Sequence, residues 1–467
     1  MSMNDSINSQ ICKFIAEMKF QDLPQESTET IKRAILDCLG VAIAGSSEIC
    51  SKILEEYVAA EKASPDCSII GGGFKTSDSL AAWVNGTKAH ALDYDDVCLP
   101  VHPTAAILPA VLALSEKYNF SGKDLMLAYL CGFEVELALA ELALSHVEKG
   151  WHVTSTFGTV GATVGCCKLL RMKEVEIRNA IGIAASLCSG LRKNFGTMTK
   201  PMHAGNAARN GVIAARLASA GWTADQDIFE GNLGFFGVFG QTSNYPKDLG
   251  LKRELRLLSR GIAIKPYPSC AATHAGIEAA IDLRRNFAFK VDDIAQVFCA
   301  TSSGIPNILI HHRPKTPLEA KFSLEFCVAV ALVEGKVGVE HFTERELNNP
   351  TIRDIMDRVT YVHPESMGKS PMDLATEVKI KLVSGIEYSK MVNTPKGDPR
   401  NPLSWDEVVD KFRNCTREIL ARGEMERAIE IVSHLEKVNT VSDLMQLLVF
   451  KKGSLRSNKT QSVVTED

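Results

Sequence analysis

The sequence predicts a mainly α-helical protein of two domains, in which an α+β unit lies between two helical stretches. Its 467 residues exceed what one hydrophobic core usually organises, so two domains are expected. Apolar residues recur at helical spacing before residue 264, whereas strand-like segments at residues 294–301 and 378–383 indicate a different unit. Helical spacing returns after Pro402.

The first 150 residues are expected to be helical, because none of their segments alternates between apolar and polar residues as a strand would. Thr28 and Thr30 are candidate caps for a helix over residues 31–43, and Ser77 and Asp78 for the next helix. Further helices are expected at residues 105–118, 123–144, 152–170 and 175–189.

The composition changes after Gly240 and again at the segment KPYPSC, which begins at Lys265. In the α+β unit we expect helices at residues 274–287, 317–332 and 343–359, and a last strand at residues 386–392. The expected boundaries are a helical part at 1–264, an α+β domain at 265–395, a helical return at 396–450 and a disordered polar tail at 451–467.

The net charge of −4 gives no basic field, which argues against nucleic acid as a partner. The thirteen cysteines stand singly apart from Cys166–Cys167 and form no CxxC pair, so reduced thiols in a cytoplasmic protein are expected. No basic segment followed by an apolar run opens the chain, and no apolar run reaches the length of a membrane span. We therefore expect a soluble protein with no membrane partner.

The segment NFGTMTKPMHAGNAARN, residues 194–210, is the first chemical candidate. Pro201 is expected to end any helix running through it, and apolar residues return at helical spacing from Val212. This pattern predicts a loop that brings Lys200 and His203 to the start of a buried helix. A cation beside a helix N-terminus suits a carboxylate or phosphate ligand. The alternative is a surface lysine in a turn.

A second candidate is HALDYDDVCLPVHP, which places Asp93, Asp95, Asp96 and His102 close together. Such a set can form a metal site, but hard-cation sites usually show a fuller pattern of oxygen ligands. It can equally form an acid/base or structural polar network, or one aspartate can cap a helix while the others are solvated. We expect no metal.

His152 and His274 each stand near a loop–helix junction, where a lone histidine is more often a cap partner than a catalyst. Cys270 could act as a thiolate nucleophile if a neighbouring base lowered its pKa. No GxxxxGK[ST] motif occurs, and the GGG at residues 71–73 lacks the context of a dinucleotide fold, so no cofactor is expected. Together the lysine and histidines suit a polycarboxylate substrate and proton transfer next to one of its carboxylates.

Five blocks resemble, in order, the motifs of the MmgE/PrpD family: HALDYDD…HPTAAILPAVLALSE, GWHVTSTFGTVGA, GTMTKPMHAGNAARNG, KPYPSCAATH and EAKFSLEF. The resemblance covers about residues 5–450. It implies a large all-α domain built from both chain ends, an inserted α+β lid domain and a homodimer. The family includes 2-methylcitrate dehydratase, cis-aconitate decarboxylase and iminodisuccinate epimerase, and no metal is required in the latter two branches.

The resemblance also implies site residues. The catalytic residues carried over are Asp93, His102, His152, Lys200 and His274. The substrate-binding residues expected around them are Lys200, His203, Cys270, Thr154 and Lys265. Val97 stands where the decarboxylase branch has Thr, and Phe326 where it has Tyr, so two hydroxyls are missing from the implied pocket. The blocks GWHVTSTFG, KNFGTMTKPMH and EAKFS are closer to iminodisuccinate epimerase.

The sequence therefore favours a cofactor-independent isomerase or lyase acting on a small di- or tricarboxylate. The leading hypothesis is an epimerase in which His152 and His274 exchange a proton on opposite faces, Lys200 holds a carboxylate and Cys270 is a possible partner. The alternative is elimination by decarboxylation or dehydration, through the same carbanion-like intermediate. A hypothesis of another class is a non-catalytic carboxylate-binding protein of this fold.

Overall fold

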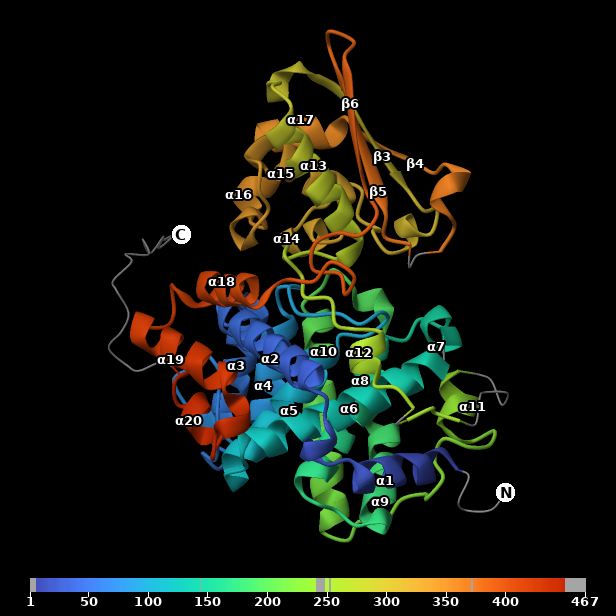
Figure 1. Ribbon diagram of the computed structural model, residues 1–467, viewed down its shortest axis with the longest axis vertical. Coiled ribbons are helices and arrows are strands. Elements are labelled where there is room, and N and C mark those ends of the chain that lie inside the picture. Colours follow the sequence, from blue (N-terminus) through green and yellow to red (C-terminus); the bar gives the residue numbers. More distant parts are fainter. Residues whose placement is uncertain (1–5, 143, 241–247, 252, 371–372, 450–467) are drawn as a thin grey trace, which may run out of the picture.

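The computed structural model describes five ranges of the chain: residues 6–142, 144–240, 248–251, 253–370 and 373–449. One continuous apolar core joins residues 7–264 with residues 403–448, so both ends of the chain build a single helical domain. A second core joins residues 272–392, which form a smaller domain, called the lid domain below. Figure 1 shows the lid domain at one end of the long axis and α1 at the other.

Four helices of the helical domain each bring one end to the boundary with the lid domain. They are α4 (Asp78–His90), α5 (Pro103–Tyr118), α8 (Val153–Leu169) and α10 (Thr199–Ser219). Small residues let these helices pack closely: a Cβ on Gly205 of α10 would collide with the carbonyl oxygen of Trp83 in α4. The close packing places the ends of α4, α5, α8 and α10 side by side.

The other helices from the first part of the chain surround these four. They are α1 (Ile7–Glu17), α2 (Gln25–Gly45), α3 (Ile49–Ala60), α6 (Gly122–Leu142), α7 (Leu144–Glu148), α9 (Glu174–Leu187), α11 (Phe235–Phe239) and α12 (Arg256–Ser259). No single helix within the described ranges is both long and apolar enough to cross a membrane, and α2 with α3 meets that test only as a pair bent by 85°.

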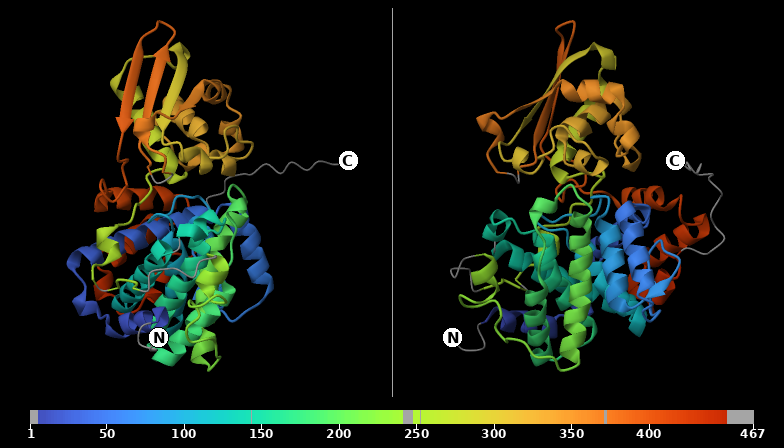
Figure 2. Two further views of the ribbon diagram at one scale, coloured as in Figure 1. Left: turned by 90° about the vertical axis from the view of Figure 1, so that its right-hand side faces the viewer. Right: turned by 180° about the vertical axis from the view of Figure 1, so that it is seen from behind.

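The end of the chain returns to the helical domain as α18 (Trp405–Thr416), α19 (Arg422–Ser433) and α20 (Ser442–Met445). Helix α18 lies directly beneath the lid domain in both views of Figure 2. It packs on α2, where a Cβ on Gly40 would lie 2.9 Å from the Phe412 ring. The return therefore brings a late segment of the chain to the boundary between the domains.

The lid domain contains a four-stranded sheet in the order β4–β3–β5–β6, formed by Val359–Val362, Ile294–Thr301, Thr376–Leu382 and Glu387–Val392. Strand β3 pairs parallel with β4 and antiparallel with β5, and β5 pairs antiparallel with β6. The lid helices are α13 (His274–Asn286), α14 (Pro317–Ala320), α15 (Leu324–Glu334), α16 (Glu344–Leu347) and α17 (Pro350–Asp357). They gather on one side of the sheet (Figure 2).

Two segments, at about residues 262–271 and 393–403, connect the domains and lie against each other. The backbone N–H of Ile264 donates to the carbonyl oxygen of Gly397 at 3.1 Å. Gly397 has φ +89, and a Cβ at this position would collide with the carbonyl oxygen of Ile264. Glycine is therefore required here. The first segment also pairs with the helical domain through Val97 and Ala263.

The predicted fold class is confirmed, but several local predictions are wrong. Thr28 and Thr30 do not cap a helix: both lie inside α2, where their hydroxyls donate to backbone carbonyls one turn back. Helix α10 begins at Thr199, so Pro201 does not end a helix but lies in the first turn of one. Proline is tolerated there because the N–H groups of the first turn have no intrahelical partner. Lys200 and His203 therefore lie on the helix rather than in a loop before it.

The structure also contains strands that the pattern did not predict. Residues 343–359 form two short helices, and β4 follows them directly. A two-residue pairing of β1 (Cys67–Ser68) with β2 (Lys75–Thr76) lies in the region expected to be helical. Strands this short give no recognisable alternation, because one or two repeats of the two-residue period do not stand out from the surrounding sequence. The predicted tail at residues 451–467 lies outside the described residues.

Candidate active site

The loop from Leu92 to Tyr94 lies at the boundary of the two domains and is held by three buried lysines. The carbonyl oxygen of Leu92 accepts from Lys321 Nζ at 2.7 Å, that of Asp93 from Lys265 Nζ at 2.8 Å, and that of Tyr94 from Lys411 Nζ at 2.8 Å. The lysines come from the lid domain, the first connecting segment and α18. The loop is thus shaped by three distant parts of the chain.

Asp93 adopts the left-handed backbone conformation, with φ +50, and its carboxylate lies between two ammonium groups. Lys200 Nζ lies 2.5 Å from Oδ1, and Lys265 Nζ lies 3.2 Å from Oδ2. Burial would raise the pKa of Asp93, but the charges of Lys200 and Lys265 hold it well below its usual value. Two cations against one carboxylate leave this cluster with a positive charge, which favours an anionic ligand.

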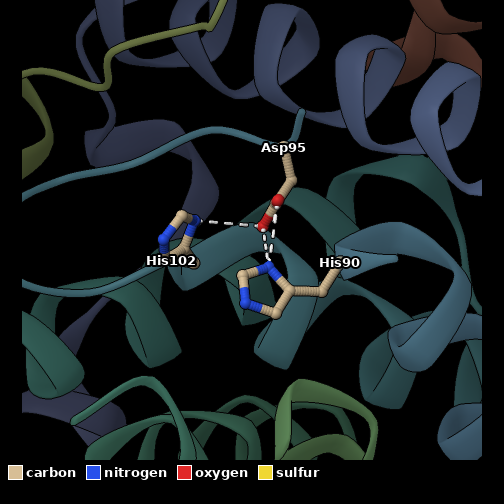
Figure 3. Close-up of side chains that lie close together, drawn as sticks. All are labelled: His90, Asp95 and His102. Carbon is tan, nitrogen blue, oxygen red and sulfur yellow. Dashed lines mark hydrogen bonds and ion pairs between the residues drawn. The ribbon is translucent and has the colours of Figure 1, made fainter. Parts of the chain in front are cut away.

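His90, Asp95 and His102 form a hydrogen-bonded group beside this cluster (Figure 3). Asp95 Oδ2 lies 2.9 Å from His90 Nδ1 and 3.2 Å from His102 Nδ1, so one carboxylate serves both rings. On the far side of the His90 ring, Lys200 Nζ lies 2.9 Å from Nε2. An ammonium group can only donate, so Nε2 of His90 carries the lone pair and Nδ1 carries the proton.

This proton placement bears on whether the three residues could hold a metal ion. Each offers a ligand atom, and the three atoms lie within 4.8 Å of one another. A metal on His90 Nδ1 would move the ring proton to Nε2, where it would point at the Lys200 ammonium group only 2.9 Å away. The hydrogen-bond pattern therefore favours the polar network over the metal site.

The imidazoles of His90, His152 and His203 are neutral because they are buried beside cations. Burial lowers the pKa of His90 to about 4, helped by Lys200 and opposed by Asp95. Burial likewise holds the pKa of His152 well below its usual range and lowers that of His203 to about 4, and the Lys200 charge adds to both effects. His152 Nδ1 and His203 Nδ1 lie 3.0 Å apart, so one donates and the other accepts.

The remaining predicted residues lie around this group. Thr154 Oγ1 accepts from the backbone N–H of His102 at 3.0 Å, so it positions that histidine. His274 Nε2 lies 3.1 Å from the Ser269 carbonyl oxygen, and burial lowers its pKa to about 3. Burial raises the pKa of Cys270, so the condition for a thiolate nucleophile is not met.

Family comparisons agree with this architecture. The model described as the MmgE/PrpD N-terminal domain matches residues 9–247, and that of the MmgE/PrpD C-terminal domain matches residues 267–437. The chain belongs to the MmgE/PrpD family. The family resemblance predicted from the sequence is therefore confirmed, and this chain is a family enzyme.

Relatives of this MmgE/PrpD chain are decarboxylases and a dehydratase. It is 30% identical to cis-aconitate decarboxylase of Mus musculus, over 96% of this chain and 94% of the relative. It is 29% identical to the Homo sapiens cis-aconitate decarboxylase, over 96% and 95%. It is 23% identical to 2-methylcitrate dehydratase of Cupriavidus necator, over 82% and 85%. These names favour the elimination alternative over the epimerase hypothesis.

Sequence reasoning missed His90, Lys321 and Phe322 of this family site, and it named Asp95 only as a member of the aspartate cluster. His90 and Asp95 complete the network in Figure 3, and Lys321 bonds to the Leu92 carbonyl group. Phe322 lies opposite Phe195, and Lys200 Nζ lies 5.4 Å from the centre of each ring. His90 and Asp95 stand in the block HALDYDD, and Lys321 and Phe322 stand in EAKFS. The family motifs therefore contained these residues, but the sequence pattern indicated no chemical role for them.

The two departures from the decarboxylase branch have different surroundings. Val97 is buried and pairs through its backbone with Ala263. Phe326 is buried in the lid core, with its ring 5.8 Å from that of Phe342, and the Phe342 ring lies 4.8 Å from Lys321 Nζ. Neither position offers a hydroxyl to a substrate in this family member.

Asp95→Asn should disrupt proton placement on His90 and His102. Both carboxylate oxygens of Asp95 face the two rings, so in the asparagine variant one of these positions becomes an NH₂ donor that points at a ring nitrogen. We expect kcat to fall at least about hundredfold, as for other changes that alter a catalytic tautomer. Nitrogen-15 spectra of the histidine rings should show an altered tautomer in the folded variant.

The matched control for that variant is Asp96→Asn. Burial keeps the pKa of Asp96 well above its usual value, so this carboxyl group is already neutral, and Thr104 bonds to it. The amide is a close substitute, and the histidine spectra should be unchanged. Wild-type spectra and activity in Asp95→Asn would contradict the proton placement.

The buried histidines should make the protein less stable as the pH is lowered from about 6.5 toward 4, whereas buried Asp37 and Glu134, whose pKa values are raised to about 6 and about 7, act in the opposite direction. An unfolded imidazole binds its proton near pH 6.5, whereas His90 and His203 stay neutral in the folded protein until about pH 4. These histidines therefore bind more protons in the unfolded state in this window, so their contribution to the free energy of unfolding rises with pH. Denaturant unfolding at a series of pH values measures this slope.

His203→Gln should reduce the slope by about one proton, because it removes one of these groups. His434→Gln, a change at an exposed histidine after α19, is the control and should leave the slope unaltered. An identical slope in the His203 variant and the wild type would show that this histidine is not held neutral.

Proposed function

We propose that this chain is a cofactor-independent lyase that acts on a small di- or tricarboxylate, by decarboxylation or dehydration next to one carboxylate. The observation that carries this proposal is the Lys200–Asp93–Lys265 cluster, whose excess cation lies against neutral imidazoles. A substrate carboxylate can take over part of the contact that Asp93 makes to Lys200. Asp93 then keeps its contact to Lys265, so no buried charge is left unpaired. The names of the relatives supply the choice of elimination over epimerisation.

His102 is the imidazole best placed to move the proton. Its Nδ1 bonds to Asp95 and to the Asp96 carbonyl oxygen at 2.9 Å, which leaves Nε2 for a substrate. Its side chain is 14% exposed, whereas those of His90 and Asp95 are fully buried. Asp95 thus positions His102 and stabilises the charge that the ring acquires when it takes a proton.

Both forms of the reaction use the same groups. In a dehydration, an imidazole nitrogen takes the proton beside the carboxylate, and a protonated group of the site donates a proton to the departing hydroxyl group, which leaves as water. In a decarboxylation, the broken carbon–carbon bond leaves its electron pair on the substrate, carbon dioxide departs, and a protonated group of the site donates to that carbon. Lys200 stabilises the negative charge that builds up on the remaining carboxylate.

Proton NMR in deuterated buffer tests this proposal with iminodisuccinate, cis-aconitate, 2-methylcitrate, citrate and tartrate. Consumption of one acid should give an elimination product: a new alkene, or the decarboxylated acid carrying one solvent deuterium. Deuterium that enters recovered iminodisuccinate without any elimination product would overturn the lyase proposal and restore the epimerase. Binding of carboxylates by thermal shift, with no exchange on any acid, would favour a binding protein.

Lys200→Ala should lower kcat/KM for the reacting acid at least about hundredfold, because it removes the charged contact to the substrate carboxylate. Lys265 still pairs with Asp93 in this variant, so the protein should stay folded while it loses activity. Lys390→Ala, a change at a half-exposed lysine of β6, is the control. Near wild-type turnover in the Lys200→Ala variant would refute the carboxylate-binding role.

A further inference from the structure

A separate cavity of about 500 Å³ lies between α2 and the two segments that connect the domains. Its lining includes Val97, Lys265 and His274, but neither Lys200 nor His152. It therefore adjoins the candidate active site without being its central chamber. The volume is within the range of small-molecule sites in proteins.

The lining of this cavity is rich in cations. Its basic residues are Arg33, Arg260, Lys265, Lys396 and Arg400, and its acidic residues are Glu26 and Asp398. Four of the five basic side chains have a carboxylate partner: Arg260 pairs with Glu141, Lys265 with Asp93, Lys396 with Glu407 and Arg400 with Asp398. Among the described residues, Arg33 is the basic side chain of the lining without such a partner, and Glu26, the other lining carboxylate, forms no ion pair either.

Arg33 of α2 is half-buried and makes no ion pair among the described residues. Its guanidinium group has two weak contacts at 3.4 Å, to the Leu403 carbonyl oxygen and to Thr30 Oγ1. A guanidinium group presents donors in a planar fork that matches the two oxygens of a carboxylate or phosphate group. In a partly enclosed cavity such an unpaired fork favours an oxyanion ligand.

The walls of the cavity are held in place before any ligand binds. Ile264 and Gly397 join the two connecting segments by a hydrogen bond of 3.1 Å. A Cβ on Gly261 would lie 2.6 Å from the Pro399 ring, so the segments are also in close contact at that point. A preformed site loses little conformational entropy on binding.

We propose that this cavity is a second binding site, specific for a small oxyanion with carboxylate or phosphate groups, in which Arg33 is the principal ligand. The site does not depend on the proposed lyase activity. A ligand on Arg33 contacts α2 and both connecting segments at once, so it stabilises the position of the lid domain on the helical domain.

Isothermal titration calorimetry at low ionic strength tests the site with two probes, inorganic pyrophosphate and citrate. The Lys200→Ala protein is used so that binding at the catalytic lysine is weakened. At least one probe should bind with one site per chain, and the better probe identifies the ligand as phosphate-like or carboxylate-like. Adding Arg33→Met should weaken that binding at least about tenfold, because a bidentate charged contact is lost.

Two further variants complete the test. Arg33→Lys keeps the charge but removes the fork, so its affinity should fall between those of the parent and Arg33→Met. Arg285→Met removes an exposed arginine of α13 outside the cavity and should leave the affinity unchanged. Equal binding in the Arg33→Met and parent proteins, or no binding of either probe at millimolar concentration, would overturn the proposal.

Discussion

The structure depends on three buried lysines that bond to three successive carbonyl groups, at Leu92, Asp93 and Tyr94. A buried ammonium group is strongly unfavourable unless its donors are satisfied, so each lysine requires this loop as much as the loop requires the lysine. The lysines come from the lid domain, a connecting segment and α18. The loop can therefore take its observed shape only when the inserted domain and the C-terminal return are both in place.

The same loop shows how environment differentiates three neighbouring carboxyl groups. Asp93 is ionised between two ammonium groups, and Asp95 is ionised between two imidazoles. Among the described residues, Asp96 accepts from the hydroxyl and backbone N–H of Thr104 and lies near Asp37 and Asp95, so burial keeps its pKa well above the usual value. One segment of four residues thus supplies an anchor for cations, an orienting group for histidines and a neutral hydrogen-bonding group.

The sequence predicted the fold class, the main helices and three of the four lid strands, because helical and strand periodicities are local. It also named His102, His152 and Lys200 as candidate site residues, since each stands at a loop–helix junction, and the roles assigned to them stay predictions. His90 was missed because its role arises from Lys200, 110 positions away, and from Asp95 on its other ring nitrogen. The start of α10 was misplaced because Pro201 is compatible with a first helical turn as well as with a break.

In the proposed site, substrate selection is expected to depend mainly on charge. Val97 and Phe326 present apolar groups where the decarboxylase branch is expected to present hydroxyls. An apolar pocket discriminates weakly between molecules of similar shape, whereas a cationic cluster strongly distinguishes a carboxylate from a neutral group. Phe326 also packs toward Phe342 beneath Lys321, the lysine that bonds to Leu92. A change at position 326 can therefore act through packing on the loop from Leu92 to Tyr94.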